Sequence, residues 1–225
     1  ITSELMQTPE MQRSTQLLQR RVTEDAFGPF LRTLGITDEQ HAEIIRLLTE
    51  RRANQLSALV ETSTGKLQGD ELAATQARFL GTDERLSREV EGVLANPNLR
   101  QRVEEFAKTE PQRGRVAQLG KSSAAAGEPL GEEQAAALTQ ALYQARRNAP
   151  FTHDFSDPLR SNPHLLIDEA VVDAYRREFQ IQLNLERSAA AGLLTPAQLT
   201  LFDQVQQRQL TVFQNDLARQ LRVMR

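Results

Sequence analysis

Cysteine and tryptophan are both absent from the 225 residues, and aromatic residues make up only 5% of the chain. Without cysteine there is no disulfide framework, no thiolate metal site and no cysteine nucleophile. No apolar run approaches the ~20 residues that a membrane-spanning helix requires. Hydrophobic residues amount to 39%, which is low for a compact globule and favours an elongated helical body with much surface per residue.

An excess of charge of one sign is also lacking, since 27 basic and 30 acidic residues leave a formal net charge of −3. A dedicated nucleic-acid binder has a strong basic excess, so we expect no nucleic-acid partner. The chain begins at Ile1 rather than at a methionine. We therefore expect that an upstream stretch, such as a signal peptide or an anchor, has been removed.

Apolar residues recur every three to four positions along almost the whole chain, and alternating strand patterns are almost absent. This spacing predicts an all-α fold of long antiparallel amphipathic helices, packed as hairpins or as an elongated bundle. Gly28-Pro29 and Gly81-Thr82 are expected to interrupt helices. The predicted helices cover about 3–26, 38–65, 70–79, 83–95, 97–108, 132–148, 164–191 and 197–225.

Several of these helices carry apolar stripes that we expect to be buried, among them the first two. The stripe of the first helix consists of Met11, Leu18 and Val22. The stripe of the second consists of Ile44, Leu48, Leu56 and either Leu59 or Val60.

A stretch rich in Gly, Ser and Ala, from Gly120 to Pro129, has the composition of a flexible connector. We expect either one elongated helical domain over 1–225 or two helical halves, 1–119 and 130–225, joined by this connector.

Three predicted helices open with the same pattern: an aliphatic residue, a Thr or Gly, two variable positions and a Gln. A Thr at the N-cap accepts a hydrogen bond from a first-turn amide, and a Gln at N3 reaches back to the N-cap amide. The spacing therefore predicts capping boxes, although a Gly at the N-cap lacks the side-chain acceptor. The copies are Ile36-Thr37-Asp38-Glu39-Gln40, Leu130-Gly131-Glu132-Glu133-Gln134 and Leu194-Thr195-Pro196-Ala197-Gln198.

The pattern Leu-Thr-x-x-Gln resembles the signature of the Spy/CpxP-like family of bacterial envelope proteins. The third copy matches it fully, the first has Ile for Leu, and the second has Gly for Thr. The resemblance implies helical hairpins that form a curved homodimer in the periplasm. It also implies ATP-independent chaperoning and a role in envelope stress or metal sensing. Capping boxes occur in many unrelated helical proteins, so the motif has a second interpretation as helix-start chemistry alone.

A proline-rich segment, 148–163, is expected to be an ordered loop whose Phe151 and Phe155 hold it against a helix. Within and beside it, His153, Asp154 and His164 are the candidates for a metal site, against the alternative of hydrogen bonds that stabilise the loop. No His-Glu-x-x-His, phosphate-binding loop or nucleophile elbow occurs in the sequence.

The absence of these motifs leads us to predict no catalytic residues, no cofactor and no enzyme activity. The leading hypothesis is a binding protein for unfolded clients or a protein partner. The alternatives are a helical scaffold oligomer and a metal-responsive sensor.

Overall fold

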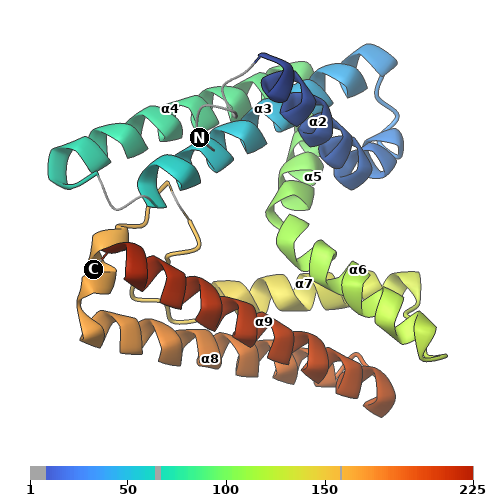
Figure 1. Ribbon diagram of the computed structural model, residues 1–225. Helices are drawn as coiled ribbons and strands as arrows, with labels where there is room; N and C mark the ends of the chain where they lie inside the picture. The colour runs from blue at the N-terminus through green and yellow to red at the C-terminus, as the bar shows by residue number, and fades with distance from the viewer. Residues whose placement is uncertain (1–8, 64–66, 158, 225) are drawn as a thin grey trace. The chain divides into compact units, whose positions relative to one another are not determined.

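The computed structural model describes residues 9–63, 67–157 and 159–224. It is 83% helical, and the described residues form no strand, so the predicted all-α fold is confirmed. The helices are α2 (Pro9–Arg32), α3 (Asp38–Ser63), α4 (Gly69–Val93), α5 (Pro97–Lys108), α6 (Glu110–Ala125), α7 (Glu132–Asn148), the 3₁₀ helix η1 (Pro163–Ile167), α8 (Glu169–Ala191) and α9 (Pro196–Met224) (Figure 1).

Two compact units make up the chain, unit 1 from Ile1 to Glu105 and unit 2 from Phe106 to Arg225. The boundary lies inside α5 and not in the predicted connector Gly120–Pro129. Residues up to Ala125 belong to α6, and Ser123 is fully buried, so the connector prediction is wrong for its first part. Small residues there permit close packing of a helix rather than flexibility.

Unit 1 is built on the antiparallel pair α3 and α4, and α2 packs against α3 (Figure 1). Burial of aliphatic and aromatic side chains, worth about 1.5–3 kcal/mol each, stabilises this arrangement. The buried side chains include Phe27 and Leu31 from α2, Ile44, Ile45, Leu47 and Leu48 from α3, and Leu72, Phe79 and Leu86 from α4.

Both predicted helix breaks in unit 1 are wrong. The helix α2 passes through Gly28-Pro29, and the chain turns only at Gly35, whose φ of 67° lies in the left-handed region. The helix α4 passes through Gly81-Thr82, and the Thr82 hydroxyl donates to the carbonyl of Arg78 one turn earlier (3.1 Å). Phe79 and Leu86, on either side of that point, are both buried.

The predicted apolar stripes are only partly buried. In α2, Leu18 and Val22 are exposed, whereas the side chain of Met11 lies outside the described residues. In α3, Ile44 and Leu48 are buried as predicted, but the later part of the stripe faces outward. There the buried positions are small or polar, Ala58 and Thr62, and the exposed ones are Leu56, Leu59 and Val60.

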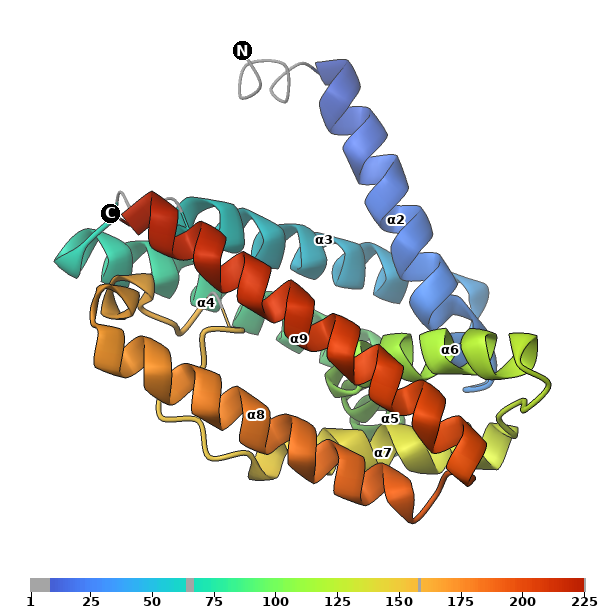
Figure 2. The same cartoon turned by 60° about the horizontal axis from the view of Figure 1, so that its bottom comes forward.

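Unit 2 comprises α6 to α9 together with η1, and α8 and α9 meet at the turn that joins them (Figure 2). The predicted helices 132–148 and 97–108 have the predicted bounds. The predicted helix 164–191 is divided, because the Asp168 carboxylate accepts from the Ala170 amide (2.8 Å) and caps a new helix. The main core of the unit consists of Val116, Leu119, Leu138, Leu142, Ala190, Leu194, Phe202 and Val205.

The junction of α5 and α6 explains why the last turn of α5 belongs to unit 2. Pro111 has no amide hydrogen, so the helical hydrogen-bond ladder is interrupted there. The Arg113 guanidinium supplies hydrogen bonds across this junction, donating to the Thr109 hydroxyl (2.8 Å) and to the Phe106 carbonyl. It also stacks on the Phe106 ring, 3.3 Å from the centroid. Phe106 is thereby attached to α6.

Candidate functional site

The first copy of the helix-start pattern forms the predicted capping box at the beginning of α3. The Gln40 amide donates to the Thr37 hydroxyl (3.2 Å), and the Thr37 amide donates to Oε1 of Gln40 (3.0 Å). The remaining side-chain atom, Nε2 of Gln40, donates to the carbonyl of Val93 at the end of α4 (3.0 Å). One glutamine therefore both caps its own helix and attaches it to a second turn.

The third copy forms the same box at the beginning of α9. The Gln198 amide donates to the Thr195 hydroxyl (3.2 Å), and the Thr195 amide donates to Oε1 of Gln198 (3.1 Å). Nε2 of Gln198 donates to the carbonyls of both Glu128 and Pro129 (3.2 Å each), in the turn before α7. Gln198 is only 3% exposed, so these bonds lie in the interior of unit 2.

The second copy completes a reciprocal arrangement. In place of a full box, the Gly131 amide donates to Oε1 of Gln134 (3.4 Å), as expected for a Gly at the N-cap. Nε2 of Gln134 donates to the carbonyl of Leu193 (2.7 Å) and to Oε1 of Gln198 (2.8 Å). We call the contacts between the turns 128–134 and 193–198 the glutamine clamp.

The sequence predicts the capping role of these glutamines but not the clamp. A glutamate or glutamine suffices at N3 of a capping box, but of these two only glutamine supplies a donor as well as an acceptor, because an ionised glutamate is an acceptor only. The presence of Gln in all three copies, and never Glu, is the signal that could have indicated the second role.

The structure does not assemble the metal candidates into a ligand set. Among the described residues no three His, Asp or Glu side chains are grouped as metal ligands. The Asp154 carboxylate instead pairs with Arg146 and accepts from the Ser156 amide (3.0 Å). His153 lies beside Phe155, with 6.1 Å between ring centroids, and the His164 amide donates to Asn162 (3.1 Å).

The proline-rich loop is ordered by aromatic contacts, as predicted. Phe151 and Phe155 lie 5.8 and 4.9 Å from the Tyr175 ring of α8, measured between centroids. Tyr175 also contacts Phe213 of α9 (5.1 Å). Burial raises the pKa of the Tyr175 phenol to about 12, and the negative charge of Asp154 adds to the effect.

With a pKa of about 12, the Tyr175 phenol should remain mostly neutral up to about pH 11. An ordinary tyrosine phenol, with a pKa near 10, is mostly ionised at that pH. Because the unfolded chain ionises first, this group's stabilising contribution is complete below about pH 10 and is lost between about pH 10 and 12. The difference in absorbance at 295 nm between the protein and its Tyr175→Phe variant isolates this phenol. A midpoint near pH 10 in the folded protein would contradict the assignment.

A buried ion pair joins α6 to α8. The Glu186 carboxylate is fully buried, and Arg115 donates to it with both terminal nitrogens, one at 2.8 Å. Nε2 of Gln182 donates to the same carboxylate (2.7 Å). We interpret this pair as structural, because Arg115 and Glu186 pair with each other between α6 and α8.

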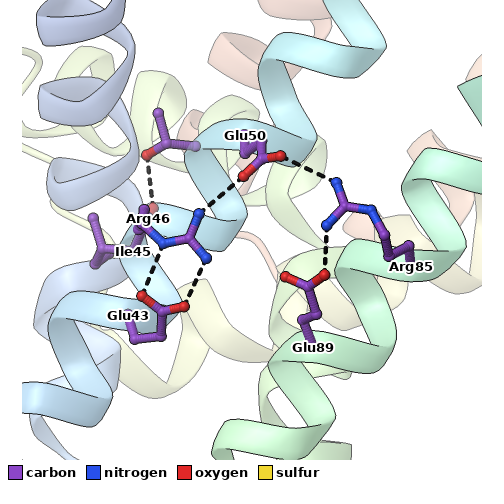
Figure 3. A network of polar contacts seen from close by, with 7 residues as sticks. Glu43, Ile45, Arg46, Glu50, Arg85 and Glu89 are labelled. Carbon is purple, nitrogen blue, oxygen red and sulfur yellow. Dashed lines mark hydrogen bonds and ion pairs between the residues drawn. The ribbon is translucent and has the colours of Figure 1, made fainter.

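The charged side chains of α3 and α4 are arranged differently, in an exposed network (Figure 3). Arg46 donates to Glu43 (2.6 and 2.8 Å) and to Glu50 (3.0 Å), while Arg85 bridges Glu50 (3.1 Å) and Glu89. The hydrogen bond from Arg46 holds the pKa of Glu43 below its ordinary value. Because these charges are paired with one another at the surface, they contribute little to stability.

Large aliphatic side chains are also exposed in unit 1, on α2 and on the second half of α3. On α2, Leu17 and Leu18 are 69% and 63% exposed. On α3, Leu56 and Leu59 are both 44% exposed, and their spacing of three residues places them on one face of the helix.

None of the described helices combines the length and the apolar character needed to cross a lipid bilayer. No protein-family model, curated protein or solved structure matches the chain. The resemblance to the Spy/CpxP-like family therefore remains a prediction based on the three helix-start turns.

Proposed function

We propose that the protein acts by binding rather than by catalysis, and that it holds non-native polypeptide segments as an ATP-independent chaperone or stress protein of the cell envelope. The supporting observation is the exposure of Leu17 and Leu18 on α2 and of Leu56 and Leu59 on α3. A side chain of this size contributes about 1.5–3 kcal/mol when it becomes fully buried against a partner. Contacts of this kind need no cofactor and no nucleotide.

The location in the envelope rests on the resemblance of the helix-start turns. The choice of an unfolded client rests on the form of the surface. Short apolar stripes on separate helices suit extended segments with scattered apolar residues better than they suit one large folded interface, which buries a continuous patch.

The direct test is suppression of aggregation. A chemically denatured client is diluted into buffer without ATP, and light scattering is followed at increasing ratios of protein to client. Scattering should fall with the amount of protein added. Unchanged scattering at a several-fold molar excess of protein would exclude the chaperone proposal.

Serine substitutions locate the binding surface. Leu17→Ser with Leu18→Ser, and separately Leu56→Ser with Leu59→Ser, should each weaken client binding by about tenfold or more, since two apolar contacts are lost. Val212→Ser is the control, because Val212 is also an exposed aliphatic residue, at 58%, but belongs to α9 and to neither proposed surface. Thermal unfolding must stay close to that of the parent protein in all three variants.

The same surfaces could instead pair with a second copy of the chain, as the scaffold hypothesis requires. Sedimentation velocity separates the two cases. A tight dimer that persists on dilution and does not suppress aggregation would favour the scaffold, whereas a monomer or weak dimer that suppresses it favours the chaperone.

A further inference from the structure

The helix-start turns occupy equivalent places in the two units. Among the described residues, each unit contains a first and a second α-helix joined by a turn, and a third and a fourth joined by another, with the 3₁₀ helix η1 between the second and third of unit 2. In unit 2 both of these turns carry the pattern, before α7 and before α9. In unit 1 the turn before α3 carries the pattern and corresponds to the turn before α7. The connection from α4 to α5 therefore corresponds to the turn before α9.

Each of the three glutamines donates to the carbonyl of a residue that directly precedes an aliphatic residue in the opposite turn. Gln134 donates to Leu193, which precedes Leu194, and Gln198 donates to Pro129, which precedes Leu130. Gln40 donates to Val93. Val93 precedes Leu94, an aliphatic residue that is 1% exposed. The turn from α4 to α5 is therefore bound in the way that a true copy of the pattern is bound.

Its sequence also resembles a copy that has lost its glutamine. Asn96 stands where an N-cap is expected, and its side chain accepts from the Asn98 amide (2.9 Å). Pro97 begins α5, just as Pro196 begins α9. One additional residue, Ala95, lies between the aliphatic residue and the N-cap. The N3 position holds Leu99, whose side chain has no donor or acceptor.

We propose that the segment Val93–Leu99 is a fourth, degenerate helix-start turn, and that it makes unit 1 the half of the chain that opens locally. In unit 2 each turn has a glutamine that donates to the other turn. In unit 1 Gln40 donates to Val93, but the opposite turn has Leu99 at the N3 position, and a leucine side chain cannot donate a hydrogen bond to the turn of Gln40. Opening at this turn releases the start of α5 and exposes the otherwise buried Leu94. The proposal concerns the free protein and does not depend on the chaperone function.

Hydrogen exchange followed by mass spectrometry on the full chain tests this inference. The three segments 90–100, 126–134 and 190–199 each connect two helices, so they offer matched local contexts. The clamp of unit 2 has several inter-turn bonds, whereas the described residues of unit 1 show one, from Gln40 to Val93. Amides in 90–100 should therefore exchange about tenfold or more faster than those in the other two segments. Equal or slower exchange in 90–100, compared at equal intrinsic rates, would overturn the proposal.

A pair of variants separates the inter-turn bond from helix capping. Gln40→Met removes the donor to Val93 and should accelerate exchange in 90–100 by about fivefold or more, with no change in 126–134. Thr37→Ala removes the hydroxyl that caps α3 but leaves Gln40 in place. It should accelerate exchange at the start of α3 and leave 90–100 unchanged. If both variants changed 90–100 equally, or if neither did, the inter-turn bond would not control opening.

Discussion

Replacing Arg115 by alanine should lower the free energy of unfolding of unit 2 by about 3–5 kcal/mol, because it leaves the buried Glu186 carboxylate without its counter-charge. The carboxylate is fully buried, and the Arg115 side chain is 18% exposed. Among the described residues, the side-chain amide of Gln182 is then the one donor that remains to the carboxylate. In a unit of this size such a loss lowers the thermal midpoint by roughly 10 °C or more.

The expected loss reflects an unpaired buried charge rather than the net value of the pair. Replacing both partners, as Arg115→Met with Glu186→Leu, should therefore recover much of the lost stability. The control is Arg187→Ala, since Arg187 and Asp203 also form a two-bond pair between helices (2.8 and 3.1 Å) but lie at the surface. Chemical denaturation should show little effect of that substitution. Equal losses for Arg115→Ala and Arg187→Ala would contradict this interpretation.

Local signals in the sequence are sufficient for the starts of several helices. Capping side chains, Pro at the first helical position and the first-turn Gln all act within four residues, so the starts of α3, α7 and α9 could be predicted. Breaks are less predictable, because a Gly or Pro lowers helix stability by an amount that burial elsewhere can offset. Gly81 lies between the buried Phe79 and Leu86, and the helix continues.

Long-range choices could not be predicted. Arg113 and Arg115 lie two residues apart in α6, yet one stacks on Phe106 and the other enters the core to meet Glu186, 71 residues away. Periodicity likewise identifies an apolar stripe without showing which part of it is covered. In α3 the stripe is buried at Ile44 and exposed at Leu56, because only tertiary packing decides which turns have a neighbour.

The glutamine clamp of unit 2 should show strong energetic coupling between its two glutamines. Gln198→Ala removes the contacts to Thr195, Glu128 and Pro129, and it should destabilise unit 2 by about 2–3 kcal/mol. Gln134→Ala should have a smaller effect of about 1–2 kcal/mol, because Gln134 is less buried. Since Gln134 donates directly to Gln198 (2.8 Å), the double variant should lose about 1 kcal/mol less than the sum of the single losses. Urea denaturation of the four proteins measures this coupling.

A charge substitution distinguishes the clamp from a simple cap. Gln198→Glu keeps an oxygen for the Thr195 amide and places negative charge at the start of α9, which by itself favours the helix. It also removes the donor that faces the carbonyls of Glu128 and Pro129 and puts a carboxylate at a position that is 3% exposed. If the inter-turn bonds dominate, this variant is at least as unstable as Gln198→Ala near pH 7. A variant as stable as the parent protein would show that the glutamine acts only within its own helix, because capping alone does not require an amide nitrogen.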